Sequence, residues 1–344
     1  AQRSASVAGL GAATGYFTLD RWLMQPGATA GRFTMAQVAD GPPGFANCLK
    51  ITTTTADTSI AAGEYLLLRQ YIEGQDLQQL KKGTASAEQF TVSFWVKGNA
   101  NALYVCEIQD ADNNRTITQS FAVTTAWNRI ELTFAADTTG AFDDDNAASL
   151  RLDFWLHAGS TYSGGTFAVN TWASTTNANR AAVDDFTSIF DATSRTFFIT
   201  GVQMEIGATA TEFESRTYGE ELALCQRYFS KSFAQGTAPV NQSSYTAGFS
   251  DVVTGSNIST TLAIGVINYP IIMRAAPTIA FYSAQGGGND DGKWSTYDGA
   301  DHLDGTVVAS TYDNKFKVVV TFASGLTSGN GTIIIGNWTA SAEL

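Results

Sequence analysis

Hydrophobic and polar residues alternate along several stretches of the chain. Between residues 90 and 97 one parity carries Phe90, Val92, Phe94 and Val96, and the other carries Thr91, Ser93, Trp95 and Lys97. Between residues 150 and 157 the inward parity carries Leu150, Leu152, Phe154 and Leu156, and the outward parity carries Arg151, Asp153, Trp155 and His157. A period of two is typical of a half-buried strand, so both stretches are predicted to be strands.

Two further stretches extend this pattern. In residues 128–134 the apolar set is Ile130, Leu132 and Phe134, and in residues 196–206 it is Phe198, Val202, Met204 and Ile206. Strand patterns return after residue 250, in the segments STTLAIGVIN, APTIAFYS, GTVVAS, KFKVVVTFA and TIIIGNWTA. Half-polar strands separated by turn-rich segments favour antiparallel sandwiches over a parallel α/β sheet. One exception is the stretch 73–83, where a helical turn is predicted to place Leu77 and Leu80 together.

The sequence TYGEELALCQRYF, residues 217–229, has the pattern of a helix. Thr217 stands at the N-cap and Glu220 at the position that completes a capping box. Leu222, Cys225 and Phe229 form a narrow apolar stripe, predicted to close the first sandwich. We therefore expect an all-β chain: an N-terminal β-sandwich over residues 1–216, a short connecting helix over 217–230, and a second β-sandwich domain over 231–344. The one thiol of this helix, Cys225, has no histidine partner, so we expect no catalytic role for the helix.

Composition narrows the possible partners. Hydrophobic residues make up 44% of the 344 positions, aromatic residues 12% and charged residues 15%, so the material for a core is ample. The net charge of −12, with 20 Lys and Arg, argues against nucleic acid and against an anionic membrane surface. No apolar run approaches the ~20 residues that span a bilayer, so we expect no membrane insertion. Cys48, Cys106 and Cys225 are predicted to be free, buried thiols.

Acidic loops are the candidate metal sites. Asp143, Asp144 and Asp145 converge in one predicted loop and are a possible Ca²⁺ site, because Ca²⁺ prefers clustered oxygen ligands. Asp290 and Asp291 are a second acidic pair. The alternative, a solvated acidic turn, is favoured because Asp and Asn commonly stabilise turns. Ca²⁺ is the one cofactor considered.

Catalytic residues do not stand out. The chain has only two histidines, so a Ser-His-Asp triad has little support. Glycoside hydrolysis needs two carboxyl groups at a defined separation. Glu64, Glu73, Glu107, Glu131 and Asp153 are of the right type, but no spacing selects a pair. We expect the protein not to be an enzyme.

Exposed aromatic residues are the candidate carbohydrate-binding sites. Trp95 and Trp155 occupy the polar parity of strong strands, and Trp294 and Tyr297 lie in an aromatic and polar loop of the second domain. A flat aromatic face stacks on a sugar ring while polar neighbours bind its hydroxyl groups. The alternative is that a loop or a neighbouring subunit covers these side chains, and burial is the more common fate of large aromatics.

Several segments resemble bacteriophage tail-fibre and virion surface proteins, in the same order along nearly the whole chain. They are GYFTLDRW (15–22), FTVSFWVKGN (90–99), AWNRIELTF (126–134), FFITGVQMEIGATATEFESRTYGEELALCQRYF (197–229), YPIIMRAAPTI (269–279) and NWTASAEL (337–344). The resemblance implies a jelly roll related to carbohydrate-binding modules, then a short helix and a second β domain. It further implies a non-enzymatic virion component, commonly a homotrimer, that is displayed for host attachment. It brings no site residues.

The leading hypothesis is a tail fibre or receptor-binding protein on the virion surface that binds host surface polysaccharide. The alternative is a capsid decoration or head-fibre protein that stabilises the shell. A third hypothesis, a glycan depolymerase, requires a carboxylate pair roughly 5–9.5 Å apart in a groove. Expected partners are further copies of the chain, as a homotrimer, and other virion proteins. The trimer is also favoured by apolar strands in the second domain that have few charges to protect an edge.

Overall fold

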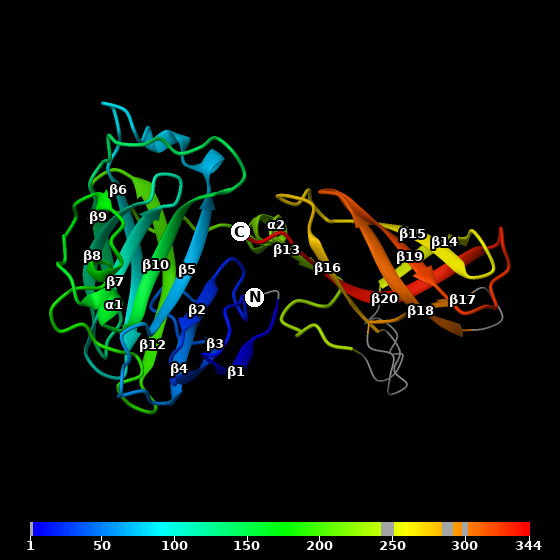
Figure 1. Ribbon diagram of the computed structural model, residues 1–344, viewed down its shortest axis with the longest axis horizontal. Helices are drawn as coiled ribbons and strands as arrows, with labels where there is room; N and C mark the ends of the chain where they lie inside the picture. Colours follow the sequence, from blue (N-terminus) through cyan, green and yellow to red (C-terminus); the bar gives the residue numbers. More distant parts are fainter. Residues whose placement is uncertain (1–2, 242–250, 284–291, 298–301) are drawn as a thin grey trace. The chain divides into compact units, whose positions relative to one another are not determined.

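The computed structural model describes residues 3–241, 251–283, 292–297 and 302–344. The chain divides into two compact units (Figure 1). The first domain comprises residues 5–215 together with Leu344, and the second comprises residues 216–343 together with Arg3 and Ser4. The connecting helix thus groups with the second domain.

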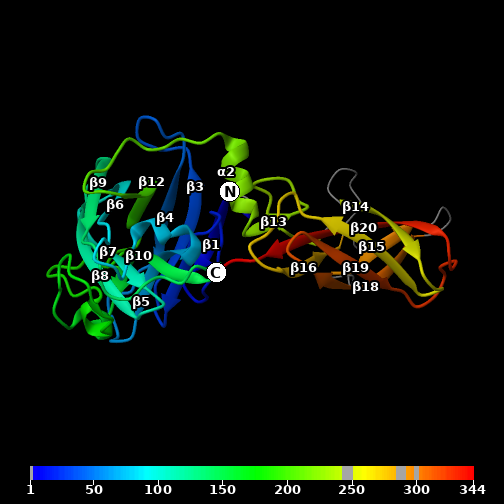
Figure 2. The same cartoon turned by 90° about the horizontal axis from the view of Figure 1, so that it is seen from above.

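Two six-stranded antiparallel sheets form the first domain, and they face each other as two layers (Figure 2). The first sheet has the order β1 (Ser6–Leu10), β3 (Arg32–Val38), β4 (Cys48–Thr55), β12 (Thr196–Ile206), β6 (Phe90–Gly98), β9 (Asn128–Phe134). The second sheet has the order β11 (Ala173–Ser174), β8 (Arg115–Val123), β7 (Ala102–Asp110), β10 (Ala148–Ala158), β5 (Tyr65–Glu73), β2 (Leu23–Gly27).

The path of the chain between the two layers makes this sandwich a jelly roll. From β4 onward the chain passes to β5 in the other sheet, returns to β6, crosses again to β7, and later returns to β9 before crossing to β10. Such crossings bring strands that are distant in sequence into pairs, as with β12 between β4 and β6. The predicted N-terminal jelly-roll sandwich is confirmed.

Apolar side chains from the two sheets fill the space between the layers. Phe94 from the first sheet contacts Phe121 and Phe154 from the second, at ring-centroid distances of 5.1 and 4.9 Å. Both contacts are edge-to-face, the arrangement that aromatic quadrupoles prefer. The inward parities predicted for residues 90–96 and 150–156 are buried in this core.

Short helical turns lie outside the sheets of the first domain. They are η1 (Gly74–Asp76), η2 (Gln78–Leu80), α1 (Ser160–Ser163) and η3 (Asn177–Asn179). The predicted helical turn after residue 73 is confirmed as η1 and η2, and Leu77 and Leu80 are both buried in the core.

The second domain is built around one long strand, β20. Its strands are β13 (Phe229–Lys231), β14 (Asp251–Asn257), β15 (Leu262–Asn268), β16 (Thr278–Tyr282), β17 (Trp294–Tyr297), β18 (His302–Thr311), β19 (Lys315–Thr321) and β20 (Gly331–Ser341). The first half of β20 pairs with β14 on one side and β17 on the other, and its second half pairs with β13 and β16. Because β14, β15, β19, β18 and β17 are paired in series, the pairing of β17 with β20 closes these six strands into a ring.

Closure of the ring leaves the apolar strands β19 and β20 with paired edges. β19 pairs with β15 and with β18, and β20 has partners on both sides along its length. The apolar strands that were expected to need protection therefore have their backbone groups paired within the domain. Their inward side chains, including Phe316 and Trp338, form the second core.

The predicted connecting helix is α2 (Tyr218–Gln226). Its capping box is confirmed: the Glu220 backbone N–H donates to the Thr217 hydroxyl, and the Glu220 carboxylate accepts from the Thr217 backbone N–H. The predicted stripe is wrong at Phe229, because the helix ends at Gln226 and Phe229 pairs with β20 as part of β13. Cys48 and Cys106 are buried thiols outside any disulfide, as expected, and Cys225 also forms no disulfide but is only half-buried.

Among the described residues, none of the helices has the length and apolar character needed to cross a membrane.

Candidate functional site

The outer face of the first sheet carries a group of aromatic side chains. In β6 the even positions 90–96 face the core, so Trp95 and Lys97 point outward. On the neighbouring strand β12, Phe198 and Thr200 are paired with these outward residues and share their face. Trp127, which immediately precedes β9, contacts Phe198 at a ring-centroid distance of 6.2 Å. None of the three aromatic residues belongs to the core between the sheets.

A β-bulge in β12 shapes this face. The register between β12 and β6 shifts between Thr200 and Gln203, and Gly201 within it has a φ of +61°, a conformation that glycine adopts without steric cost. A Cβ atom at Gly201 would lie 2.6 Å from the Phe45 ring, so the bulge also makes room for that ring. The one extra residue in β12 reverses which of its side chains face the core and which face outward beyond the bulge. The prediction that Phe198 shares a face with Val202 is therefore wrong: Phe198 points outward, and Val202 packs on the core.

Two loops bring further aromatic rings to this face. Phe45, from the loop before β4, contacts Phe213 edge-to-face at 5.1 Å. Phe213 is 37% exposed, and Phe45, Trp95 and Trp127 are half-buried. We call Phe45, Trp95, Trp127, Phe198 and Phe213 the aromatic platform. Its rings are held in place by the sheet and by each other, yet several of them keep part of their surface in solvent.

Fixed charges lie beside the platform. The Lys97 ammonium lies 4.8 Å from the Phe198 ring centroid and 5.2 Å from that of Trp127, within the range of cation–π attraction. Both Asp40 carboxylate oxygens accept hydrogen bonds from it at 2.8 Å. The indole N–H of Trp127 has no acceptor among the described residues. The platform therefore combines apolar rings with a positioned cation and a carboxylate, whereas the Trp127 N–H is itself buried.

The chain after β12 folds back over one part of this face. The Thr211 backbone N–H donates to the Glu205 carboxylate at 2.9 Å, and the Glu214 N–H donates to the Gln203 side-chain oxygen at 2.8 Å. Burial raises the pKa of Glu205, but hydrogen bonds from Gln203 and Thr211 outweigh it, so that pKa lies below its usual value. These contacts hold the segment that carries Phe213.

For Trp155, a candidate carbohydrate-binding residue on the outer face of its strand, the structure confirms the alternative, that a loop covers the side chain. Its side chain is fully buried beneath the segment 159–190, which lies outside β7, β8 and β10 (Figure 2). The indole N–H donates to the Glu107 carboxylate at 2.7 Å, and the Arg180 guanidinium lies 4.8 Å from the ring centroid. The covering segment therefore removes this indole from contact with any ligand.

Under the same segment lies a buried network of two carboxylates and two arginines. Arg180 donates to Glu107 at 2.8–3.0 Å, and Arg69 holds Asp153 through two hydrogen bonds of 2.6 and 2.5 Å. Arg180 also approaches Asp153 at 3.4 Å, which joins the two pairs. Asp153 and Glu107 are direct cross-strand neighbours, so β7 and β10 place the charges and the covering segment supplies one of their counterions. Burial lowers the pKa of Arg180, but the neighbouring Glu107 outweighs that effect, so the pKa of Arg180 lies above its usual value.

The aromatic site predicted in the second domain is also different from expectation. Trp294 is fully buried, donates its N–H to the Asn337 carbonyl at 3.2 Å and contacts Phe281. The absence of a side chain at Gly336 lets the indole lie against the β20 backbone. Tyr297 belongs to β17 by its backbone, but its side chain lies outside the described residues, as do Asp290 and Asp291.

The predicted calcium loop is exposed at Asp143, Asp144 and Asp145. The Asp145 carboxylate accepts the Ala147 backbone N–H at 2.8 Å, which is how an aspartate stabilises a turn. In the described parts of the chain, three acidic or histidine side chains gather closely at one place only, and these aspartates are not among them. Calcium binding at this loop stays a prediction.

Comparison with known proteins finds a distant similarity to carbohydrate-binding modules. No model of a protein family matches the chain, and no curated protein matches it. A family 4 carbohydrate-binding module is 14% identical with a TM-score of 0.31 and covers 60% of this chain and 97% of its own. The family 11 module of a Clostridium thermocellum cellulosomal cellulase gives 15% and 0.29, over 57% of this chain and 97% of its own.

A third structure comes from a virus. The enzymatically active domain of bacteriophage CBA120 tailspike protein 4 is 13% identical with a TM-score of 0.29, over 54% of this chain and 19% of its own. At these values the likeness is distant, is one of fold alone, and bears on no residue of the site.

Sequence reasoning missed Phe45, Trp127 and Phe213 as parts of the platform. Trp127 stands one residue before an alternating strand, so its direction was not set by the strand parity. Phe45 and Phe213 lie in loops, and only the folded chain brings them together. The sequence feature that could have indicated the platform is the high density of aromatic residues near the half-polar strand that contains Trp95.

Proposed function

We propose that the protein is a non-catalytic, glycan-binding surface protein of a phage virion, a tail fibre or receptor-binding protein that attaches to host surface polysaccharide through the aromatic platform. The observation that carries the glycan-binding part is the group of half-exposed aromatic rings fixed on the outer face of the first sheet beside Lys97 and Asp40.

The chemistry of a sugar fits this surface. A pyranose ring presents C–H groups on its faces, which pack on aromatic rings, and hydroxyl groups at its edges, which need donors and acceptors. Trp95 and Phe213 offer the rings. The Lys97 ammonium and the Asp40 carboxylate offer a donor and an acceptor. Because the rings are already held by the sheet and loops, little side-chain entropy is lost on binding.

The non-catalytic part is supported by the state of the best-placed carboxylates. A glycosidase needs one carboxyl group that is protonated before it attacks the glycosidic oxygen. Glu107 and Asp153 are neighbours, but each is held by an arginine in a buried ion pair and lies beneath the segment 159–190. Because both carboxylates are fully buried and already bound by arginine, neither is placed to reach a glycosidic oxygen.

The virion part rests on the sequence resemblance to phage tail-fibre and virion surface proteins. A capsid decoration or head-fibre protein with the same modules is the alternative. Imaging of labelled protein in particles distinguishes the two: a signal on the tail supports the tail fibre, and a signal on the head supports the alternative. Absence from purified particles would overturn both.

Glycan binding is tested with the intact protein on an array of bacterial surface polysaccharides, followed by titration of the best ligand. We expect Trp95→Ala and Phe213→Ala each to weaken that affinity at least about tenfold, which is about 1.4 kcal/mol. Tyr218→Ala is the matched control, because Tyr218 is a 71% exposed aromatic residue in α2, outside the platform. Binding that is unchanged in both platform variants, or no binding to any glycan, would contradict the proposal.

A further inference from the structure

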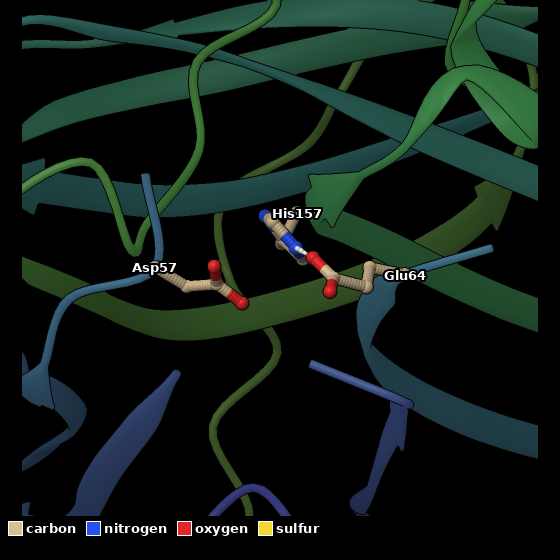
Figure 3. Close-up of side chains that lie close together, drawn as sticks. All are labelled: Asp57, Glu64 and His157. Carbon is tan, nitrogen blue, oxygen red and sulfur yellow. Dashed lines mark ion pairs between the residues drawn. The ribbon is translucent and has the colours of Figure 1, made fainter. Parts of the chain in front are cut away.

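Three ionisable side chains from separate parts of the first domain meet near one end of the second sheet. Asp57 lies in the loop between β4 and β5, Glu64 immediately precedes β5, and His157 lies at the end of β10 (Figure 3). All three are buried, with exposed fractions of 6, 7 and 0%. Buried ionisable groups are rare unless they are paired or bind a metal.

The atoms that face one another have metal-ligand spacing. One ligand atom from each residue lies within 4.8 Å of the other two. His157 Nε2 and Glu64 Oε2 are 3.5 Å apart. Ligands bound to one tetrahedral zinc ion at 2.0–2.1 Å are about 3.3–3.4 Å from each other. The pair is therefore near the separation a shared ion would impose, and Asp57 needs only a small closing movement.

Each side chain is held on the side away from the others. His157 Nδ1 lies 2.8 Å from the Ser188 hydroxyl, which leaves Nε2 directed at Glu64. The Asp57 carboxylate accepts hydrogen bonds from the Thr29 hydroxyl and the Ala30 backbone N–H, both at 2.8 Å. Partners of this kind orient histidine and carboxylate ligands in metal sites.

The atoms that point into the group lack partners of their own. His157 Nε2 and Glu64 Oε2 are both buried without a hydrogen-bond partner in the described residues. A buried polar atom left unpaired is destabilising, so two of them facing each other call for a third group between them.

We propose that Asp57, Glu64 and His157 bind one divalent transition-metal ion of the zinc class. Two carboxylates and one neutral imidazole are a ligand set that Zn²⁺ accepts, with a fourth position left for a further ligand. Ca²⁺ is disfavoured here, because it takes six to eight oxygen ligands and this group supplies a nitrogen. The ion would tie the loop before β5 to the end of β10, so its role is to stabilise the sandwich.

The test is a metal analysis of the full-length protein. Because the site is buried, the protein is expressed in medium supplemented with Zn²⁺, washed with a weak chelator and analysed by mass spectrometry for metal per chain. We expect about one equivalent of zinc per chain. Protein expressed with Co²⁺ in place of Zn²⁺ should show the visible absorption bands of a four-coordinate cobalt ion. The conservative variants Glu64→Gln and His157→Gln should each lower zinc affinity at least about tenfold.

Two controls separate this site from other zinc binding. Glu88→Gln removes a carboxylate of the same domain whose side chain is 39% exposed, and Cys225→Ser removes the most accessible of the three thiols. Both should retain the metal. Circular dichroism shows whether each variant is folded, and a folded Glu64→Gln protein that keeps a full equivalent of zinc would overturn the proposal. So would wild-type protein without bound zinc or cobalt, a result that would leave a proton shared by Asp57 and Glu64 as the explanation of the cluster.

Discussion

Glu107 is the carboxylate around which the buried charges of the first domain are arranged. It accepts hydrogen bonds from Arg180, from the Trp155 indole and from the Thr116 hydroxyl, and it has no exposed surface. Glu107→Gln keeps the shape of the side chain but removes its charge, which leaves the Arg180 guanidinium in a dry site without its main counterion. We expect a loss of about 3–5 kcal/mol in the free energy of unfolding, measured by urea titration.

Glu131→Gln serves as the control for Glu107→Gln. Glu131 lies on the same domain, and its nearest cation is Arg129 at 3.3 Å, with 46% of the carboxylate side chain exposed. Exposed pairs of this kind contribute about 0–1 kcal/mol. Equal, small losses in the two variants would show that the network under the segment 159–190 is not the stabilising element described here.

Asp137 is expected to make the unfolding free energy of the first domain depend on pH in the acidic range. It accepts hydrogen bonds from Arg115 at 2.7 Å and from the Thr139 backbone N–H at 3.0 Å, and Lys82 lies 3.1 Å away. Burial raises its pKa, but these partners outweigh burial and hold the pKa below its usual value. A carboxyl with a lowered folded-state pKa adds stability above its unfolded pKa, near 4, and loses it as the pH falls through the folded value.

The expected measurement compares wild type with Asp137→Asn across pH. The difference in unfolding free energy should be full at about pH 6 and shrink steadily below about pH 4. Asp144→Asn, at an exposed position, should show little difference at any pH. A difference between wild type and Asp137→Asn that stays constant down to about pH 2 would mean that Asp137 stabilises the fold by packing rather than by charge.

For single residues, the sequence predicted the sheet face on which a side chain lies better than it predicted what covers that face. The alternation correctly placed Trp155 away from the core between the sheets, but it was wrong for His157: a register shift between Trp155 and His157 pairs His157 with Leu66, a core residue, and the imidazole contacts Phe190 of the same core. What it could not show is that residues 159–190 cover this outer face, because the contact of Arg180 with Glu107 joins positions far apart in the chain. The same reason hid the cluster of Asp57, Glu64 and His157, whose members have no shared local pattern.

Among the elements, the bulge in β12 has the most direct effect on the proposed site. Gly201→Ala would force a residue with a Cβ atom into φ +61° and bring that atom within 2.6 Å of the Phe45 ring and 3.3 Å of the Trp95 indole. We expect a loss of about 1–2 kcal/mol in unfolding free energy from the backbone strain alone. The displaced Phe45 should also weaken glycan binding and shift tryptophan fluorescence.

Gly219→Ala is the matched control for the bulge. Gly219 lies in α2, it is not among the positive-φ residues, and a Cβ atom there would meet no other atom within 4 Å. Alanine in place of glycine in a helix is expected to be neutral or to stabilise by up to about 1 kcal/mol. If Gly201→Ala behaved like this control, the left-handed conformation at the bulge would not be required.

Elements with local signals were predicted well, and the bulge shows where such signals end. The capping box at Thr217 and Glu220 is a contact over three residues, so the sequence alone identified it. The strand 196–206 was identified as well, but an inserted residue inverts its parity, and the single glycine in an apolar run was the only sign of it. The sequence therefore did not predict that Phe198 lies on the outer face of the sheet, where it forms part of the platform; the structure shows this.

At the scale of the whole molecule, ring closure in the second domain changes the reason to expect self-association. Long-range pairing of β17 with β20 has no local signal in the sequence, and it leaves β19 and β20 without a free edge among the described residues. What remains is a set of apolar side chains on the outside of the ring, including Val266, Val308 and Ile333, which are 52, 56 and 39% exposed. They lie on three separate strands of the ring, β15, β18 and β20, and exposed apolar side chains of this kind are candidates for a protein–protein interface.

We therefore expect the intact protein to be a homotrimer, as the sequence resemblance implies, with the outside of this ring contributing to its interface. Light scattering after size exclusion should give three times the chain mass of 36.6 kDa, about 110 kDa. Val308→Asp and Val266→Asp should each shift the protein toward monomer, because a buried, unpaired carboxylate costs several kcal/mol at an interface. Val169→Asp, at a 60% exposed valine of the first domain, should leave the trimer intact. A wild-type protein at monomer mass would contradict the trimer, and dissociation by Val169→Asp alone would place its interface on the first domain.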